Sequence, residues 1–329
     1  MAPERGLSSL STDAEAPDKW STTAASAKQR LDNYVPQEGR PDGKLVVALK
    51  AFLDYLPKGG RASIARDILD SKDDQELYQV FSNLLTGLLA PQSVKFEHVA
   101  STLSGTQSRE DQFRTDVFCR DRQRCVQTNF THRSHWVEIG SLEDDSWAYL
   151  EGVHIIPFSM GSENSSHLEH DRAMMWEVLY RYFPAVRHTG IAVATINDPS
   201  NGITLTDFAH KEFAKCHCAL KKTDVPNKYG FNVYNSCAHP YRRLLPSGPI
   251  QFERAEDATD VPFPHPDLLD CHYRIAEILN ASGMGEEIDR KLDDWDKMKR
   301  SMPDGCLNED GSTNVADILR TALWQKVMG

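Results

Sequence analysis

The stretch LEGVHIIPFSMG at residues 150–161 constrains the fold most, because an apolar run that ends at a proline reads as a strand followed by a turn. His154 lies at the end of this run, just before Pro157. Further along the chain, the stretch NDPSNGITLTDFAHKEF at residues 197–213 places a second histidine, His210, in the expected first turns of a helix. The sequence therefore raises the question of whether both histidines belong to one site.

Helical patterns flank this middle region. Residues 44–91 predict a helical hairpin or small bundle, because leucines recur at helical spacing and Asp73 precedes Glu76 by three positions, as in a capping pair. Residues 167–183 predict a helix between the two histidines, and residues 268–283 and 314–327 predict helices near the C-terminal end. Short strands are expected after Arg124, where polar and β-branched or aromatic residues alternate. The pattern favours an α+β fold.

Composition narrows the class of protein. The chain has 329 residues and contains no apolar run as long as the roughly 18 residues that a membrane span needs, so we expect no membrane partner. The seven cysteines are an odd number and no secretion signal is evident, which indicates reduced thiols in the cytoplasm or nucleus. The net charge of −11 argues against a protein that coats nucleic acid without specificity. Basic residues nevertheless outnumber acidic ones, seven to three, within residues 206–243.

The order of these elements resembles the HNH, or ββα-metal, endonuclease motif. VHIIPFS at residues 153–159 is similar to its first half, and NGITLTDFAHKEF at residues 201–213 is similar to its second half. FCRDRQRCVQTN at residues 118–129 resembles the strand that precedes the motif in fungal HNH-domain proteins, and the likeness extends over roughly residues 45–329.

The resemblance implies an α+β fold in which helices flank a small ββα-metal core. The expected regions are a disordered tail (1–42), a helical region (43–110), the nuclease-like core (111–245) with a helical insertion at about 162–190, and a C-terminal helical region (246–329).

The resemblance also implies an activity, namely endonucleolytic hydrolysis of phosphodiester bonds in DNA or RNA with Mg²⁺ or Mn²⁺. His154 would be the general base, a role that suits an imidazole whose ordinary pKa is about 6.5. Asn201 would hold the local loop, and His210 would bind the metal ion. Asp207 precedes His210 by three positions on the same helix and could supply a second ligand.

Several basic side chains are candidates for binding phosphate groups. Arg120, Arg122 and Arg124 alternate as on one face of a strand, which suits a track of phosphates, although a solvated edge strand explains them equally well. Lys211 and Lys215 surround His210 and are further candidates, although ordinary solvated helix faces also carry such charges.

Two other functions fit the sequence. The HNH scaffold could serve a reaction on a small molecule, which is favoured by the insertion, by the acidic net charge and by Val153, where many HNH sites have an acidic ligand. The chain could also be a noncatalytic interaction protein. An open basic groove between His154 and His210 would favour the nuclease, and a closed apolar pocket would favour the small-molecule enzyme. The sequence does not indicate the oligomeric state.

Overall fold

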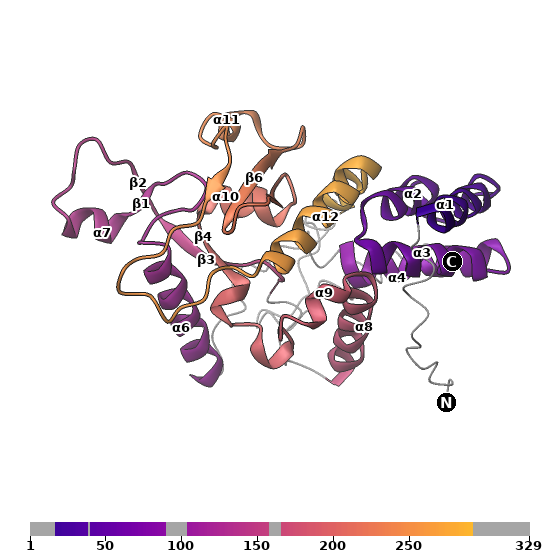
Figure 1. The fold of residues 1–329 in the computed structure, drawn as a ribbon, viewed down its shortest axis with the longest axis horizontal. Helices are drawn as coiled ribbons and strands as arrows, with labels where there is room; N and C mark the ends of the chain where they lie inside the picture. Colours follow the sequence, from indigo (N-terminus) through magenta and orange to yellow (C-terminus); the bar gives the residue numbers. More distant parts are fainter. Residues whose placement is uncertain (1–16, 39, 90–103, 158–165, 292–329) are drawn as a thin grey trace, which may run out of the picture.

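The computed structural model describes residues 17–38, 40–89, 104–157 and 166–291 (Figure 1). Within these residues, helices lie at both ends of the chain and small β-sheets lie in the middle, so the predicted α+β class is confirmed. No helix in this described part is long and apolar enough to cross a membrane. The helix predicted at 314–327 lies outside the described residues.

The N-terminal part is a bundle of helices, which we call the helical module. Its elements are α1 (Pro17–Asp32), α2 (Leu45–Tyr55), α3 (Lys58–Asp70), α4 (Asp74–Leu84) and the π-helical turn η2 (Leu85–Leu89). Helix α4 begins as the sequence predicts, because the Asp73 carboxylate accepts the backbone N–H of Glu76 at 2.8 Å. The Glu76 carboxylate in turn accepts the backbone N–H of Lys72 at 2.8 Å, which satisfies a second unpaired donor near this helix end.

The prediction of a disordered tail over residues 1–42 is wrong for part of its length. Residues Pro17–Asp32 form helix α1, in which Ala27 and Leu31 are fully buried. Few large apolar residues occur in this segment, but those that do pack against a core that the neighbouring helices already supply. Residues 1–16 lie outside the described part.

A ββα unit lies in the middle of the chain. Strands β3 (Leu150–His154) and β4 (Gly202–Thr206) pair antiparallel, with His154 opposite Gly202. Helix α10 (Asp207–Ala214) follows β4 directly, and the Thr206 hydroxyl caps it by accepting the backbone N–H of Ala209. Helix α6 (Ser104–Arg120) packs on the same strand pair.

The chain between β3 and β4 contains the predicted helical insertion. It forms α8 (Ser166–Tyr182), α9 (Pro184–Arg187) and the 3-10 turns η4 (Val193–Thr195) and η5 (Pro199–Asn201). Helix α8 packs against α3 and η2 of the helical module. The contact is close at Gly60, where a Cβ atom would lie 1.9 Å from the Tyr182 carbonyl oxygen. The insertion thus joins the ββα unit to the helical module.

The remaining elements surround the ββα unit. They are β1 (Thr131–His132), α7 (Arg133–Glu138), β2 (Trp147–Ala148), β5 (Cys218–Lys222), β6 (Lys228–Val233), α11 (His239–Arg242), β7 (Ile250–Gln251) and α12 (Pro266–Ser282). β1 and β2 pair parallel, whereas β5, β6 and β7 form an antiparallel sheet. Helix α12 packs on both β5 and α2, and it lies between the middle of the molecule and the helical module (Figure 1).

The predicted strand that carries Arg120, Arg122 and Arg124 on one face is wrong. Helix α6 extends to Arg120, and a turn follows in which Arg122 and Gln123 have φ angles of 57° and 54°. The three arginines therefore point into different environments. Alternating spacing is compatible with a helix end and a turn as well as with a strand.

Arg120 is fully buried and bridges several segments. Its guanidinium bonds both carboxylate oxygens of Asp121, at 2.8 and 3.0 Å. It also donates to the carbonyl oxygens of Pro199 at 2.8 Å, Gly202 at 2.8 Å and Pro262 at 3.0 Å. Arg120 is therefore a structural residue that fixes η5, the start of β4 and the loop before α12 against the end of α6.

We expect Arg120→Met to destabilise the protein strongly. The substitution leaves the Asp121 carboxylate buried without its cation and three carbonyl oxygens without this donor, and breaking a buried pair in this way costs about 3–5 kcal/mol. Arg122→Met is the matched control, because Arg122 is about half exposed and pairs with Glu253 at 2.7 Å, a surface contact that contributes about 0–1 kcal/mol. Urea denaturation of both variants measures the difference. Equal unfolding free energies would contradict the structural role of Arg120.

Candidate nuclease site

The site is built on the β3–β4 pair, with a helix on each face. A Cβ atom at Gly152 would lie 3.2 Å from the Cα of Arg114 in α6, so even-numbered positions of β3 face that helix. Odd-numbered Glu151 instead contacts His210 of α10. Gly202 lies opposite His154, where a Cβ atom would come within 2.7 Å of the Phe113 ring. Only glycine leaves room for this close packing of α6 on the end of the strand pair.

His154 is partly buried at the end of β3. Its ring stacks on the Phe113 ring with a centroid separation of 4.1 Å and an interplanar angle of 5°. Its Nε2 lies 2.8 Å from the Oδ1 of Asn197, a side chain that precedes η5. Burial lowers the pKa of His154 to about 4, and the hydrogen bond with Asn197 offsets only part of this effect. The imidazole is therefore neutral at pH 7, and its pKa lies below the ordinary value that the sequence suggested.

Asn201 is fully buried and holds the loop that follows β3. Its Oδ1 accepts the backbone N–H of Ile156 at 2.8 Å, and its Nδ2 donates to the carbonyl oxygens of Ile156 and Ile196, both at 3.0 Å. The Asn201 backbone carbonyl also accepts the N–H of Ile155 at 2.8 Å. One asparagine thus ties the first half of the motif to the second, and it fixes the backbone on the C-terminal side of His154.

His210 and Glu151 form a pair that the sequence did not predict. The Nδ1 of His210 contacts the Glu151 carboxylate across the space between α10 and β3, and the two side chains are 38% and 49% exposed. The hydrogen bond with His210 lowers the pKa of Glu151, and the nearby charges of Lys211 and Arg114 lower it further. Glu151 is therefore an accessible carboxylate. The charge of His210 also lowers the pKa of His154, which indicates that the pair lies near that imidazole.

Glu151 could have been found from the sequence, because it is a carboxylate within a predicted strand whose neighbouring residues are mostly apolar. Val153, the position expected to carry an acidic ligand, is buried, whereas Glu151 lies two positions earlier and points to α10. Asp207, the predicted second ligand, lies in the first turn of α10 and forms an ion pair with Lys211 at 3.6 Å. Among the described residues, no group of three or more His, Cys, Asp or Glu side chains is arranged to hold a metal ion.

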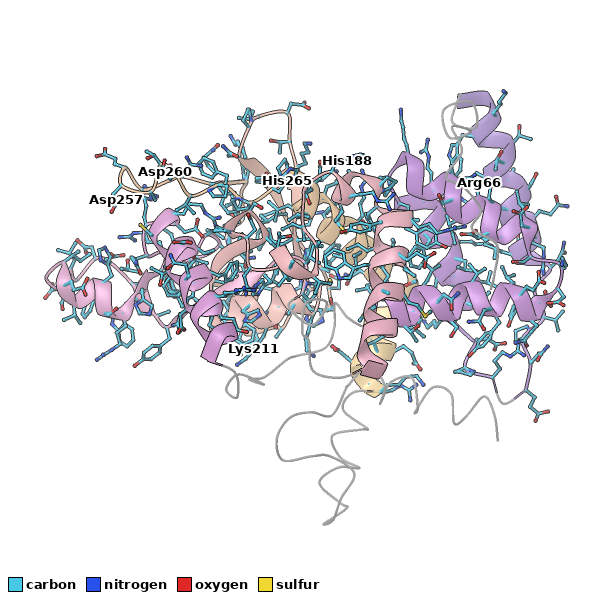
Figure 2. The ribbon with its side chains drawn as sticks, turned by 90° about the horizontal axis from the view of Figure 1, so that it is seen from below. Arg66, His188, Lys211, Asp257, Asp260 and His265 are labelled. Carbon is cyan, nitrogen blue, oxygen red and sulfur yellow. The ribbon has the colours of Figure 1, made fainter. Side chains whose placement is uncertain are left out.

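The predicted phosphate-binding residues are distributed over several surfaces. Arg120 is buried, which rules out the contact with phosphate that the sequence suggested for it. Arg122, Arg124 and Lys215 form ion pairs with Glu253, Asp145 and Asp289, at 2.7, 2.7 and 2.8 Å. Lys211, which is labelled in Figure 2, pairs with Asp207 at 3.6 Å, and its charge also lowers the pKa of Glu151.

Arg114 is a cation that the sequence analysis missed. It is exposed on α6, its guanidinium lies 5.1 Å from the centre of the Phe118 ring, and its charge lowers the pKa of Glu151. No ion pair of Arg114 occurs within the described residues. Arg114 and Lys211 therefore place positive charge beside Glu151 from α6 and from α10. No sequence pattern points to Arg114, because its position depends on how α6 packs on β3.

Comparison with known proteins gives one match to a protein family. The family described as HNH endonuclease matches residues 125–221, a segment that includes His154, Asn201 and His210. No curated protein and no solved structure matches the chain. The middle of the chain is thus similar to the HNH endonuclease family, and helices lie on both sides of the matched segment.

Proposed function

We propose that the protein is a metal-dependent endonuclease that hydrolyses phosphodiester bonds in nucleic acid. The observation that carries this proposal is the Glu151–His210 pair, an exposed carboxylate and imidazole from a strand and a helix, close to the neutral imidazole of His154. The proposal also rests on the match of residues 125–221 to the HNH endonuclease family. The family supports nuclease chemistry, while the roles of individual residues are our inference.

The carboxylate of Glu151 and the imidazole of His210 suit a hard divalent ion such as Mg²⁺ or Mn²⁺. Mg²⁺ keeps several water molecules in proteins and is commonly bound through only one or two carboxylates, so a complete cage of side chains is not required. Glu151 would contribute a carboxylate oxygen and His210 a ring nitrogen, with Asp207 as a further candidate close by on α10. When bound, such an ion would neutralise charge on the phosphate and on the leaving oxygen.

His154 is suited to accept a proton from the attacking water. Its pKa of about 4 keeps the imidazole neutral across the physiological range, so the proton-accepting form is fully populated, although the same shift makes it a weaker base than an ordinary histidine. The Asn197 Oδ1 can only accept a hydrogen bond, so Nε2 carries the proton in the neutral ring and Nδ1 has the lone pair. The stacked Phe113 and the Asn201-bound loop hold this ring in place. A base held in one orientation loses less conformational entropy in the transition state.

The exposure of Glu151 and His210 favours a polymeric substrate over a small molecule. Both side chains are more than a third exposed, with the cations Arg114 and Lys211 nearby, which suits an anionic chain lying across the surface. An enzyme for a small molecule usually encloses most of its substrate surface. Helix α8, the longest element of the helical insertion, packs on α3 and η2 of the helical module. The six cysteines of the described part are free thiols, which suits the cytoplasm or nucleus as the site of action.

Metal binding tests the assignment of Glu151 and His210. We expect Glu151→Gln and His210→Ala each to weaken Mn²⁺ binding about tenfold or more, because each removes one of few protein ligands. Isothermal titration calorimetry measures the dissociation constants. Asp207→Asn is the matched comparison on the same helix, and it should change the affinity less than either variant. If Asp207→Asn alone weakens binding, Asp207 rather than Glu151 is the carboxylate ligand.

Cleavage kinetics test the role of His154. We expect His154→Ala to lower single-turnover cleavage of a labelled plasmid by about 10²–10⁴-fold, the usual contribution of a general base, with Mn²⁺ affinity close to that of the wild type. His210→Ala should lose activity that a raised Mn²⁺ concentration partly restores. Circular dichroism serves as the folding control. Activity at the wild-type level in His154→Ala would remove the base assignment and leave His154 as a packing residue of β3.

A further inference from the structure

A strip of aromatic and basic side chains, all exposed except the partly buried His132, leads away from the candidate site. It comprises Arg114, His132, Arg133, Trp147 and Tyr149, and we call it the aromatic strip. Trp147 and Tyr149 are 40% and 65% exposed, although large aromatic side chains usually bury most of their surface. Arg133 is also exposed, with its guanidinium 5.1 Å from the centre of the Trp147 ring. The rings therefore present their faces or edges to solvent next to a cation.

The rings of the strip are held by specific contacts. Trp147 and Tyr149 meet edge to face, with centroids 6.1 Å apart and an interplanar angle of 86°. The ring of Trp136 lies 6.1 Å from that of Trp147, and its Nε1 donates to the Leu142 carbonyl oxygen at 3.0 Å. Exposed rings that are fixed in this way are preorganised for stacking, because a ligand would not have to order them first.

The aromatic strip is continuous with the candidate site at two points. Tyr149 directly precedes β3, so it lies two positions before Glu151 on the same extended segment. On the other side, Arg114 lies over the Phe118 ring, whose centroid is 5.5 Å from that of His132, the neighbour of Arg133. In Figure 1, β2 and α7 lie on the side of β3 that is away from the helical module. A chain bound at Glu151 and His210 could therefore extend along the strip without leaving the surface.

We propose that the aromatic strip binds an unpaired strand of nucleic acid that leads to the cleavage site. Bases stack on Trp147 and Tyr149, and phosphate groups lie against Arg114 and Arg133. Stacking on aromatic side chains requires bases whose faces are accessible, which single strands offer and paired duplexes do not. The inference rests on the proposed function and specifies its substrate class: single strands, or unpaired segments that adjoin a duplex.

The charges around the aromatic strip indicate how tightly the strip binds a strand of nucleic acid. Glu138, Glu143 and Asp144 lie close to the strip in the sequence and are exposed, whereas Asp145 is neutralised by Arg124. These carboxylates repel phosphate, so stacking rather than charge supplies most of the affinity. We expect moderate binding with a shallow dependence on salt, because only a few phosphates are contacted.

Fluorescence anisotropy of labelled oligonucleotides in EDTA tests this inference without cleavage. The wild type should bind an oligothymidine strand more tightly than a blunt duplex of the same length. Trp147→Ala and Tyr149→Ala should each weaken binding of the single strand about tenfold, the usual loss on removing one stacked base contact. Trp147→Phe keeps a ring and should stay within about threefold of the wild type, since only the extent of stacking changes.

The helical module provides a matched control. There Arg61 of α3 lies over the ring of Trp20 of α1 at 4.4 Å, a contact of the same kind. In Figure 1, α1 and α3 lie on the opposite side of the molecule from β2 and α7. Trp20→Ala should leave the affinity for the single strand unchanged, and urea denaturation verifies that each variant is folded. Equal binding of duplex and single strand, or unaltered binding by Trp147→Ala and Tyr149→Ala, would overturn the inference.

The same experiment separates this inference from the proposed function. Binding of the single strand through Trp147 and Tyr149, without cleavage when Mn²⁺ is added, would support the strip and contradict the endonuclease. Cleavage of a duplex without preference for unpaired strands would support the endonuclease and contradict the strip.

Discussion

The buried ion pair of Arg120 and Asp121 is the interaction on which the geometry of the middle region depends. Removing a guanidinium and a carboxylate from water costs several kcal/mol for each ion, and this cost is offset only when the polar atoms of both groups are bonded. Arg120 donates to carbonyl oxygens of η5, of β4 and of the loop before α12. Asp121 accepts the backbone N–H of Thr204 at 2.9 Å. The pair therefore fixes α6 relative to β4 and to η5, the turn that carries Asn201.

The sequence predicted those elements whose formation depends on residues that are close together along the chain. Leucines at helical spacing identified α2, and the carboxylate of Asp73 identified the start of α4. The order of His154, Asn201 and His210 identified a strand end, a turn and a helix that do lie together. Such signals are local, because the periodicity and the caps depend only on neighbours along the chain.

The sequence did not predict features that depend on packing between distant segments. Arg120 and Arg122 have the spacing of a strand face but lie at a helix end and in a turn with positive φ, and their immediate neighbours do not distinguish the two cases. Glu151 becomes a partner of His210 only through the register of β3 with β4 and the packing of α10. Arg114 comes to lie beside that pair because α6 packs on β3.

Helix α6 supports the candidate site although it lies outside the segment that matches the HNH endonuclease family. The match to the HNH endonuclease family begins at residue 125, whereas α6 ends at Arg120. The ring that stacks on His154 and the arginine that anchors η5 both come from this helix, so they lie outside the matched segment. The unit that builds the candidate site is therefore larger than the segment that the family match covers. A fragment cut at the motif boundaries would keep the three signature residues and lose the surface that holds them.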